Sequence, residues 1–293
     1  MSGTPTKYGI LTAVDGSAES RAAVSWAASE AALRNEPVTL MHVIQPVVSW
    51  PIGVENGAIA EWQEDTARDA IAQARNDLTA VMNQSRPLEV RTEVLYANAG
   101  HALVEASKDA QMIVVGSHGK GALGRLLLGS VSSGVVHHAH CPVVVVHTDE
   151  DSPVDLTAPI LLGIDGSPAS EAATAWAFDE ASRRAVPLAA LHAWSDVGVF
   201  PILGMNWRTY REKGEELLGE RLAGWQEQYP DVPVERRLVC DTPARWLLEQ
   251  SEHCQLVVLG SHGRGGFGGM LLGSVSSALA QSAKVPVVVV RTQ

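Results

Sequence analysis

Short apolar runs alternate along this chain with longer stretches in which apolar residues recur every three or four positions. The run at residues 9–14 ends at a turn signal, and the helical spacing that follows extends to about Arg34. A second apolar run covers residues 38–44. These runs are almost continuous rather than alternating, which is typical of strands buried on both faces of a parallel sheet. The pattern therefore predicts an α/β fold, an open sandwich with helices on both faces of the sheet.

The first half of the chain predicts three further helices and three further strands. Helical spacing returns at about residues 59–84, near Asn98 and at 130–139, and strands are predicted at 88–95, 112–115 and 143–146. In the second half, strands are expected at 160–164, 188–193, 234–240, 256–259 and 287–290, and helices at 168–184, 207–228, from Pro243 onward and at 274–283. Ser167 and Thr242 are the expected N-caps, because each precedes a proline that fits the first helical position.

The two halves are copies of one unit. Residues 116–148 and 260–292 are identical at 20 of 33 positions without a gap, and the turn at residues 15–17, Asp-Gly-Ser, recurs at 165–167. The offset is 150 residues at the turn and 144 at the later segment, so the second copy is six residues shorter in its middle. A period of this length is the size of one domain. We expect two tandem domains, residues 1–150 and 151–293, each with a five-stranded, mainly parallel sheet.

Composition is that of a soluble globular protein and excludes several classes. Hydrophobic residues make up 46% of the 293 residues, enough for two ordinary cores, and the longest aliphatic runs are far shorter than a membrane span. The first residues show no secretory signal, so we expect a cytoplasmic protein with its three cysteines reduced. A formal net charge of -11 gives no electrostatic footprint for nucleic acid. We expect neither nucleic-acid binding nor membrane insertion.

The duplicated segment carries the most specific chemistry. Its glycines follow a G-x2-G-x9-G-S spacing, at Gly116, Gly119 and Gly129-Ser130, directly after the fourth predicted strand. Glycine lets backbone N–H groups approach a phosphate, and Ser130 lies where a helix N-terminus adds donors, so that it either caps this helix or binds a phosphate oxygen. The alternative is that these glycines only form a tight turn. The second copy keeps the pattern at Gly260, Gly263, Gly273 and Ser274.

Two other nucleotide signatures fail in context. Residues 119–124 and 263–268 fit G-x-G-x-x-G, but a dinucleotide fold places that motif after its first strand, with an acidic residue about 20 positions further on. Here the motif follows the fourth predicted strand. The sequence contains no G-x-x-x-x-G-K-[ST] loop either, since Gly121 follows Lys120 and Arg264 replaces that lysine in the second copy.

A second candidate lies at the end of the first predicted strand. In an open α/β sheet, ligands bind at the carboxyl ends of the strands where the strand order reverses. If the first and fourth strands are neighbours, Asp15 and the glycine loop line one pocket, as Asp165 and its loop do in the second copy. Asp15 is alternatively only a helix-capping acid. No acid, base and nucleophile recur together in both copies, so we predict no catalytic residues, and no metal site even at the His137, His138 and His140 cluster.

The glycine spacing, joined to an Asp-Gly-Ser turn after the first strand, resembles the universal stress protein family in its ATP-binding branch. The resemblance covers essentially the whole chain, twice, as in the tandem-domain members of mycobacteria and related actinobacteria. It implies a Rossmann-like fold of the adenine nucleotide alpha hydrolase type, with one ATP in each domain and Mg²⁺ as an optional companion. The residues implied around the first nucleotide are Ala13, Asp15, Val43, Gly116, Ser117, His118, Gly119, Lys120, Gly121, Gly129, Ser130 and Val131. Those implied around the second are Gly163, Asp165, Ala193, Gly260, Ser261, His262, Gly263, Arg264, Gly265, Gly273, Ser274 and Val275.

The resemblance also implies a role. It is that of a nucleotide-dependent regulator of stress response and growth, whose nucleotide-bound state is read by a regulatory protein partner. The resemblance further implies a homodimer, and it implies that the fifth, Val-rich strands of the two domains pair antiparallel. Because Ala13 stands where the second copy has Gly163, we expect a narrower first pocket. Two alternatives remain open: a slow ATP hydrolase or phosphotransferase that uses the same pocket, and an interaction scaffold that binds no nucleotide.

Overall fold

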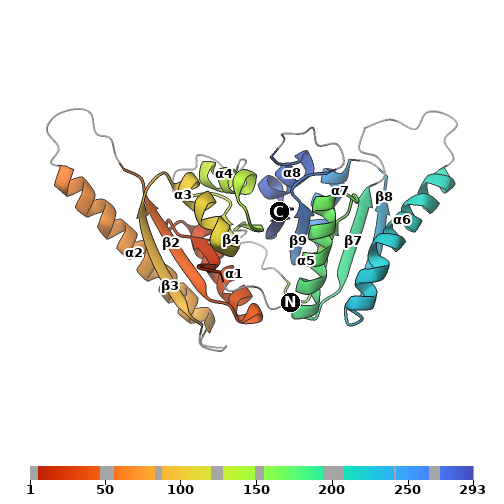
Figure 1. Cartoon of the computed structure of the whole chain (residues 1–293), viewed down its shortest axis with the longest axis horizontal. Helices are drawn as coiled ribbons and strands as arrows, with labels where there is room; N and C mark the ends of the chain where they lie inside the picture. The colour runs from red at the N-terminus through yellow and green to blue at the C-terminus, as the bar shows by residue number, and fades with distance from the viewer. Residues whose placement is uncertain are drawn as a thin grey trace. The chain divides into compact units, whose positions relative to one another are not determined.

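The chain divides into two compact units, Met1–Thr148 and Asp149–Gln293, in a computed structural model that describes residues 6–46, 56–82, 88–119, 128–148, 155–193, 207–240, 242–263 and 271–292. Each unit is an α/β sandwich in which helices cover a sheet whose neighbouring strands run parallel (Figure 1). The predicted fold class is confirmed. Among the described residues, no helix is long and apolar enough to cross a membrane.

In the first unit, the strand order places the first and fourth strands side by side. The strands are β1 (Gly9–Ala13), β2 (Val38–Ile44), β3 (Val90–Tyr96), β4 (Ala110–Gly116) and β5 (Val143–Val146). The helices are α1 (Ala18–Arg34), α2 (Asn56–Met82), α3 (Ala99–Ala106) and α4 (Ser130–His138), and η1 (Ser107–Asp109) is a short 3-10 helix. The order is β3-β2-β1-β4-β5, so the direction in which strands are added reverses between β1 and β4.

The second unit repeats this arrangement. Its strands are β6 (Ile160–Gly163), β7 (Leu188–Ala193), β8 (Val234–Val239), β9 (Leu256–Gly260) and β10 (Val287–Val290), in the order β8-β7-β6-β9-β10. Its helices are α5 (Pro168–Arg184), α6 (Trp207–Gln228), α7 (Pro243–Ser251) and α8 (Ser274–Ser282). The predicted elements are present in both units with their ends shifted by a few residues.

Capping residues set where several helices begin. Ser17 and Ser167 are the N-caps of α1 and α5, and each side chain accepts a hydrogen bond from a backbone N–H three residues further on. Asn98 caps α3 in the same way. Thr242 stands at the N-cap of α7, but its side chain makes no capping hydrogen bond, so the prediction of a capping side chain is wrong there. Its backbone ψ of 111° departs from the 160° at Ser167.

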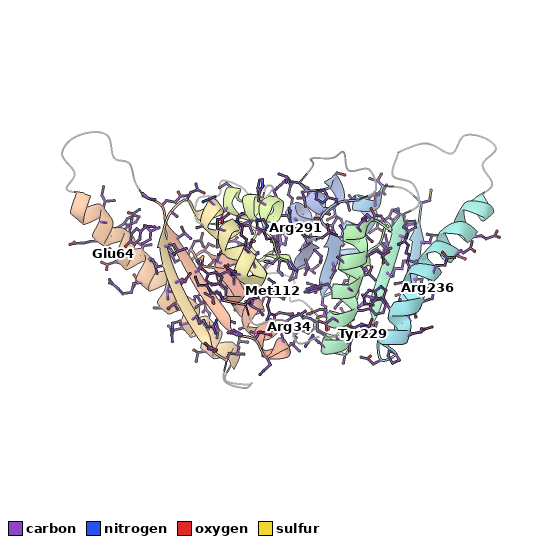
Figure 2. All side chains as sticks on the ribbon, viewed as in Figure 1. Arg34, Glu64, Met112, Tyr229, Arg236 and Arg291 are labelled. Carbon is purple, nitrogen blue, oxygen red and sulfur yellow. The ribbon has the colours of Figure 1, made fainter. Side chains whose placement is uncertain are left out.

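Aromatic packing fixes the long helix α6 in the second unit. Phe178 on α5 is fully buried, and its ring centroid lies 6.1 Å from that of Trp225 and 5.8 Å from that of Tyr229. Tyr229, labelled in Figure 2, follows directly after the last turn of α6. Contact of the half-buried Trp225 and Tyr229 rings with the buried Phe178 ring holds α6 against α5.

An ion pair joins the equivalent helices in each unit, but the acidic and basic residues have exchanged helices between the two units. In the first unit, Arg21 on α1 donates two hydrogen bonds to Asp77 on α2, at 2.8 and 3.1 Å, and these bonds lower the pKa of Asp77. The same two positions in the second unit hold Glu171 on α5 and Arg221 on α6, which also form an ion pair. The charges have changed places while the contact between the helices has been kept.

Reversing one of these charges should destabilise the first unit, and reversing both should restore it. Asp77→Arg brings two guanidinium groups together, and we expect it to lower the free energy of unfolding by roughly 1 kcal/mol. Arg21→Glu in the same chain recreates the polarity of the second unit and should recover most of this loss. Urea unfolding of the four chains measures the coupling energy.

The coupling should also depend on pH. Because folding depresses the pKa of Asp77, its contribution is present above the unfolded pKa and is lost as the pH falls through the folded pKa. A double variant that is no more stable than Asp77→Arg alone would contradict this account of the contact.

Candidate functional site

The loops after β1 and β4 meet at the point where the strand order reverses. β1 and β4 are parallel neighbours, with Thr12 opposite Val114, so both strands end at the same edge of the sheet. A side chain built at Gly119 would place its Cβ 2.5 Å from Oδ2 of Asp15. The carboxylate therefore lies directly against the glycine loop, in the place that the sequence predicted if these strands were neighbours.

The second unit has the same contact. A Cβ built at Gly263 would lie 2.6 Å from Oδ2 of Asp165. Since β6 and β9 are also parallel neighbours, the same topology produces the same approach of aspartate and glycine. Side-chain-free backbone at these two positions is a requirement of the contact.

The aspartate is fixed by its own turn. Oδ1 of Asp15 accepts hydrogen bonds from the backbone N–H and the hydroxyl of Ser17, at 2.9 and 2.6 Å. Gly16 has a φ of 78°, in the left-handed region that favours glycine, and this reverses the chain between them. Ser17, not Asp15, occupies the N-cap position of α1, and Asp15 stands just before it as an acceptor for the N–H of the cap residue. One carboxylate oxygen is held by the turn, and the other reaches the glycine loop.

The glycines of the loop meet different neighbours. A Cβ at Gly116 would lie 2.7 Å from the carbonyl carbon of Glu19, in the first turn of α1, and Gly260 meets Ala169 in the same way at 2.6 Å. These two glycines let a helix pack against the end of a strand. A Cβ built at Gly129 would meet nothing closer than 3.4 Å, and the N–H of Gly129 donates to the carbonyl of Ser117 at 2.8 Å, which closes the loop. Packing therefore explains Gly116 and Gly260, and contact with the aspartate explains Gly119 and Gly263.

The loop ends at a helix start without a capping side chain. Gly129 and Gly273 are the N-caps of α4 and α8, and neither helix has a side-chain cap. Ser130 and Ser274 are the first helical residues, so the interpretation of Ser130 as the cap is wrong, because the glycine before it occupies that position. The first amides of a helix have no intrahelical acceptor, and they carry the positive end of its dipole. This end of each helix is therefore suited to an anionic acceptor.

A serine orients the histidine of each loop. The hydroxyl of Ser117 lies 3.0 Å from Nδ1 of His118, and that of Ser261 lies 2.8 Å from Nδ1 of His262. Both serines are buried, whereas the histidines are half-buried. Nε2 of His118 is buried and has no hydrogen-bond partner among the described residues.

A cavity of about 410 Å³ opens beside these groups in the second unit. The predicted residues that line it are Gly163, Asp165, Ala193, Gly260, His262, Gly263, Gly273, Ser274 and Val275. Ser261 is not among the lining residues, since its hydroxyl contacts His262. The described members of the first set, Ala13, Asp15, Val43, Gly116, Ser117, His118, Gly119, Gly129, Ser130 and Val131, hold the corresponding positions in the first unit. Lys120, Gly121, Arg264 and Gly265 lie outside the described residues.

Some residues that line the cavity were not predicted from the sequence. The start of α7 lines the cavity with Thr242, Pro243 and Ala244, and Leu247 follows one turn later. Leu191 on β7 faces the same space. The Thr-Pro helix signal was visible in the sequence, and a helix that crosses back to the strand next to β6 has to pass this edge of the sheet. The signal located the helix but did not show that its start borders the pocket.

The difference between Ala13 and Gly163 is offset by a neighbour. A Cβ at Gly163 would collide with Cδ2 of Leu259. The first unit has Val115 at the position of Leu259, which is one carbon shorter. Ala13 with Val115 and Gly163 with Leu259 thus contain the same number of side-chain carbons. This exchange removes the reason to expect that Ala13 narrows the first pocket.

Fold and site together define a protein of two tandem α/β domains, each with an aspartate turn against a glycine loop at the point where strand order reverses. The model of the universal stress protein family matches residues 9–147 and 157–291. The chain belongs to the universal stress protein family, as its motifs predicted.

Full-length relatives have the same tandem length. The chain is 58% identical over 287 residues to a universal stress protein of Mycolicibacterium smegmatis, covering 98% of each chain. It is 50% identical over 293 residues to one of Mycobacterium tuberculosis, covering 99% of each. The crystal structure of a universal stress protein from Archaeoglobus fulgidus covers 97% of this chain and 98% of its own, with a TM-score of 0.70 at 20% identity, which shows the shared fold.

The roles assigned to the glycines predict a graded series of stabilities. Gly116→Ala forces a methyl group into the backbone of α1 and should lower the free energy of unfolding by about 2–3 kcal/mol. Gly119→Ala meets the end of a side chain that can rotate, so it should cost no more than about 1.5 kcal/mol, the loss of hydrogen bonds in the Asp15 turn. Gly134→Ala, where a Cβ meets nothing within 4 Å on α4, should stabilise by roughly 0.5–1 kcal/mol. Urea unfolding measures all three.

The order of the series is the test. If Gly116→Ala proves as stable as Gly119→Ala, the packing role of Gly116 is wrong and this glycine belongs with the ligand-facing group.

Proposed function

We propose that each domain binds one adenine nucleotide, ATP, and that the protein is a nucleotide-dependent regulator of stress response and growth. The observation that carries the proposal is the cavity of the second unit, whose two ends differ in chemistry. Asp165, His262, Gly263 and the start of α8 form a polar end, and the other lining residues are mostly apolar, with aliphatic side chains from β7, β9 and α7 among them. A volume of about 410 Å³ falls within the range of small-molecule sites, roughly 300–1,000 Å³.

Charge determines which part of a nucleotide fits each end. The chain has a formal net charge of -11, so a polyanion has to be held by local donors. The uncapped start of α8 supplies backbone N–H groups and a positive dipole end for phosphates. Asp165 repels phosphate and accepts hydrogen bonds, which suits sugar hydroxyls. The aliphatic wall then takes the base.

A metal ion would enter this site with the phosphates. Among the described residues, no group of three or more His, Cys, Asp and Glu side chains is placed to hold a metal ion. Mg²⁺ commonly keeps several waters and binds through substrate phosphates. Such binding needs no cage of protein ligands, and it is the mode that we propose for Mg²⁺ here.

The nucleotide acts as a signal more than as a substrate in this proposal. Each serine of the loop is paired with the imidazole of its neighbour, at 3.0 Å in the first unit and 2.8 Å in the second. We propose that the protein works in the cytoplasm as a homodimer and that a regulatory protein reads its nucleotide-bound state. Steady turnover of ATP would instead favour the hydrolase or phosphotransferase alternative.

Equilibrium dialysis with labelled ATP tests the proposal. We expect two ATP molecules per chain for the wild type, one for Ser130→Asp or Ser274→Asp, and none for the double variant. An aspartate at the first helical position is compatible with the helix but repels phosphate. Ser130→Asn and Ser274→Asn are the matched controls, since they have nearly the same shape without the charge, and they should weaken binding far less.

Two outcomes would count against the proposal. A wild-type chain that retains no nucleotide at saturating ATP would leave the scaffold alternative. Phosphate release that continues over many turnovers and stops in the double variant would make the protein an enzyme.

A further inference from the structure

The two units agree at one end of the site and differ at the other. Of the eighteen positions that line the cavity of the second unit, ten have the same residue type in the first unit and eight do not. The ten that agree include the aspartate, the described loop glycines and the start of α8. The eight that differ lie on β6, β7, β9, the residue after β6, and the start of α7: Gly163, Ile164, Leu191, Ala193, Thr242, Pro243, Ala244 and Leu259.

We infer that the two sites hold the anionic part of their nucleotide in the same way but select its base differently, and that the first site is the stricter. This inference rests on the proposed function, since it names the specificity of the same two sites. Two positions bear on it, Val43 against Ala193 and Ala99 against Pro243.

Position 43 carries a larger side chain in the first unit than its counterpart in the second. Leu191 and Ala193 line the cavity of the second unit from one face of β7. In the first unit the corresponding residues are Met41 and Val43, and the register is conserved, because Met41 pairs with Ala13 as Leu191 pairs with Gly163. The valine has two side-chain carbons more than Ala193. Pro243 in turn has two side-chain carbons more than Ala99, so the two exchanges together move bulk from one wall of the site to the other without narrowing it.

Position 99 gives the first site one more hydrogen-bond donor. Pro243 lines the cavity of the second unit as the first residue of α7, and proline has no N–H. The first residue of α3 is Ala99, whose N–H has no acceptor within the helix. Asn98 caps this helix through the N–H of His101, which leaves the amide of Ala99 to other acceptors. The corresponding wall of the second site lacks this donor.

A donor in the wall changes selectivity more than apolar contact does. A site that donates a hydrogen bond to its ligand rejects analogues without the acceptor, because a polar group is then left unpaired. An apolar wall accepts ligands of similar size nearly alike. The first site therefore has the more polar environment for the base, while the described residues at the phosphate end have the same types in both sites.

Single-site chains separate these two properties. A chain with Ser274→Asp keeps only the first site able to bind nucleotide, and a chain with Ser130→Asp keeps only the second. Titration calorimetry with ATP, GTP and CTP gives the base selectivity of each site, defined as the highest of the three Kd values divided by the lowest. The same measurement with AMP, compared with ATP, gives the contribution of the outer phosphates. We expect the base selectivity of the first site to exceed that of the second by roughly tenfold, the effect of one hydrogen bond. The ratio of the AMP and ATP dissociation constants should agree between the sites within about threefold.

Exchanging residues between the units should transfer the selectivity. Ala99→Pro in the first-site chain should reduce its base selectivity to that of the second site, and Pro243→Ala in the second-site chain should raise it. The helix tolerates this proline, because Asn98 already has the extended conformation, φ -71° and ψ 124°, that a following proline requires. Ala99→Val is the matched control, since it adds bulk and keeps the N–H. Val43→Ala should relax the first site further.

The outcomes distinguish this inference from the proposed function. Equal base selectivity in the two single-site chains, or a selectivity unchanged by Ala99→Pro, would overturn the inference and leave nucleotide binding intact. Failure of both single-site chains to bind any of the four nucleotides, when circular dichroism shows them folded, would overturn both.

Discussion

The parallel pairing of β1 with β4, and of β6 with β9, is the constraint on which the rest of each unit depends. These pairs join the first and fourth strands of each unit, which lie far apart in the sequence, and bring their carboxyl ends to one edge of the sheet. The loops that follow then have to approach one another, and each aspartate reaches a glycine so closely that no side chain fits between them. Hydrogen bonds within the Asp-Gly-Ser turn hold the carboxylate in that position. The site is thus a consequence of topology, completed by a few residues with strict steric requirements.

Duplication kept some of these requirements and relaxed others. Ten of the fifteen positions from Gly116 to Ser130 have the same residue in the second unit, and three of these are fixed by separate contacts, with a helix, an aspartate and the loop's own backbone. At two other places, the units use different residue pairs that make an equivalent contact. Arg21 with Asp77 became Glu171 with Arg221, and Ala13 with Val115 became Gly163 with Leu259. Among the positions that line the cavity, those that differ lie on β6, β7 and β9, at the residue after β6 and at the start of α7, where we propose that the base lies.

Much of this could be predicted from the sequence, because the deciding signals are local. Apolar runs, serine caps and helix-starting prolines located the elements, and the repeat of Asp15 and the glycine spacing located the site. The functions of single glycines could not be predicted, because they depend on what lies opposite each one in space. Spacing alone does not distinguish Gly116, which packs against α1, from Gly119, which faces Asp15. For the same reason the lining residues at the start of α7 were missed, since only the folded sheet brings them to the cavity.

The central claim is that each unit binds a nucleotide between its aspartate turn and its glycine loop. A crystal structure of the chain with ATP tests this most directly. The account predicts phosphate density at the backbone amides of Ser130 and Ser274, with the sugar beside Asp15 and Asp165 and the base against the aliphatic wall. Density for ATP at any other place, or its absence from both loops in crystals grown at saturating nucleotide, would contradict it.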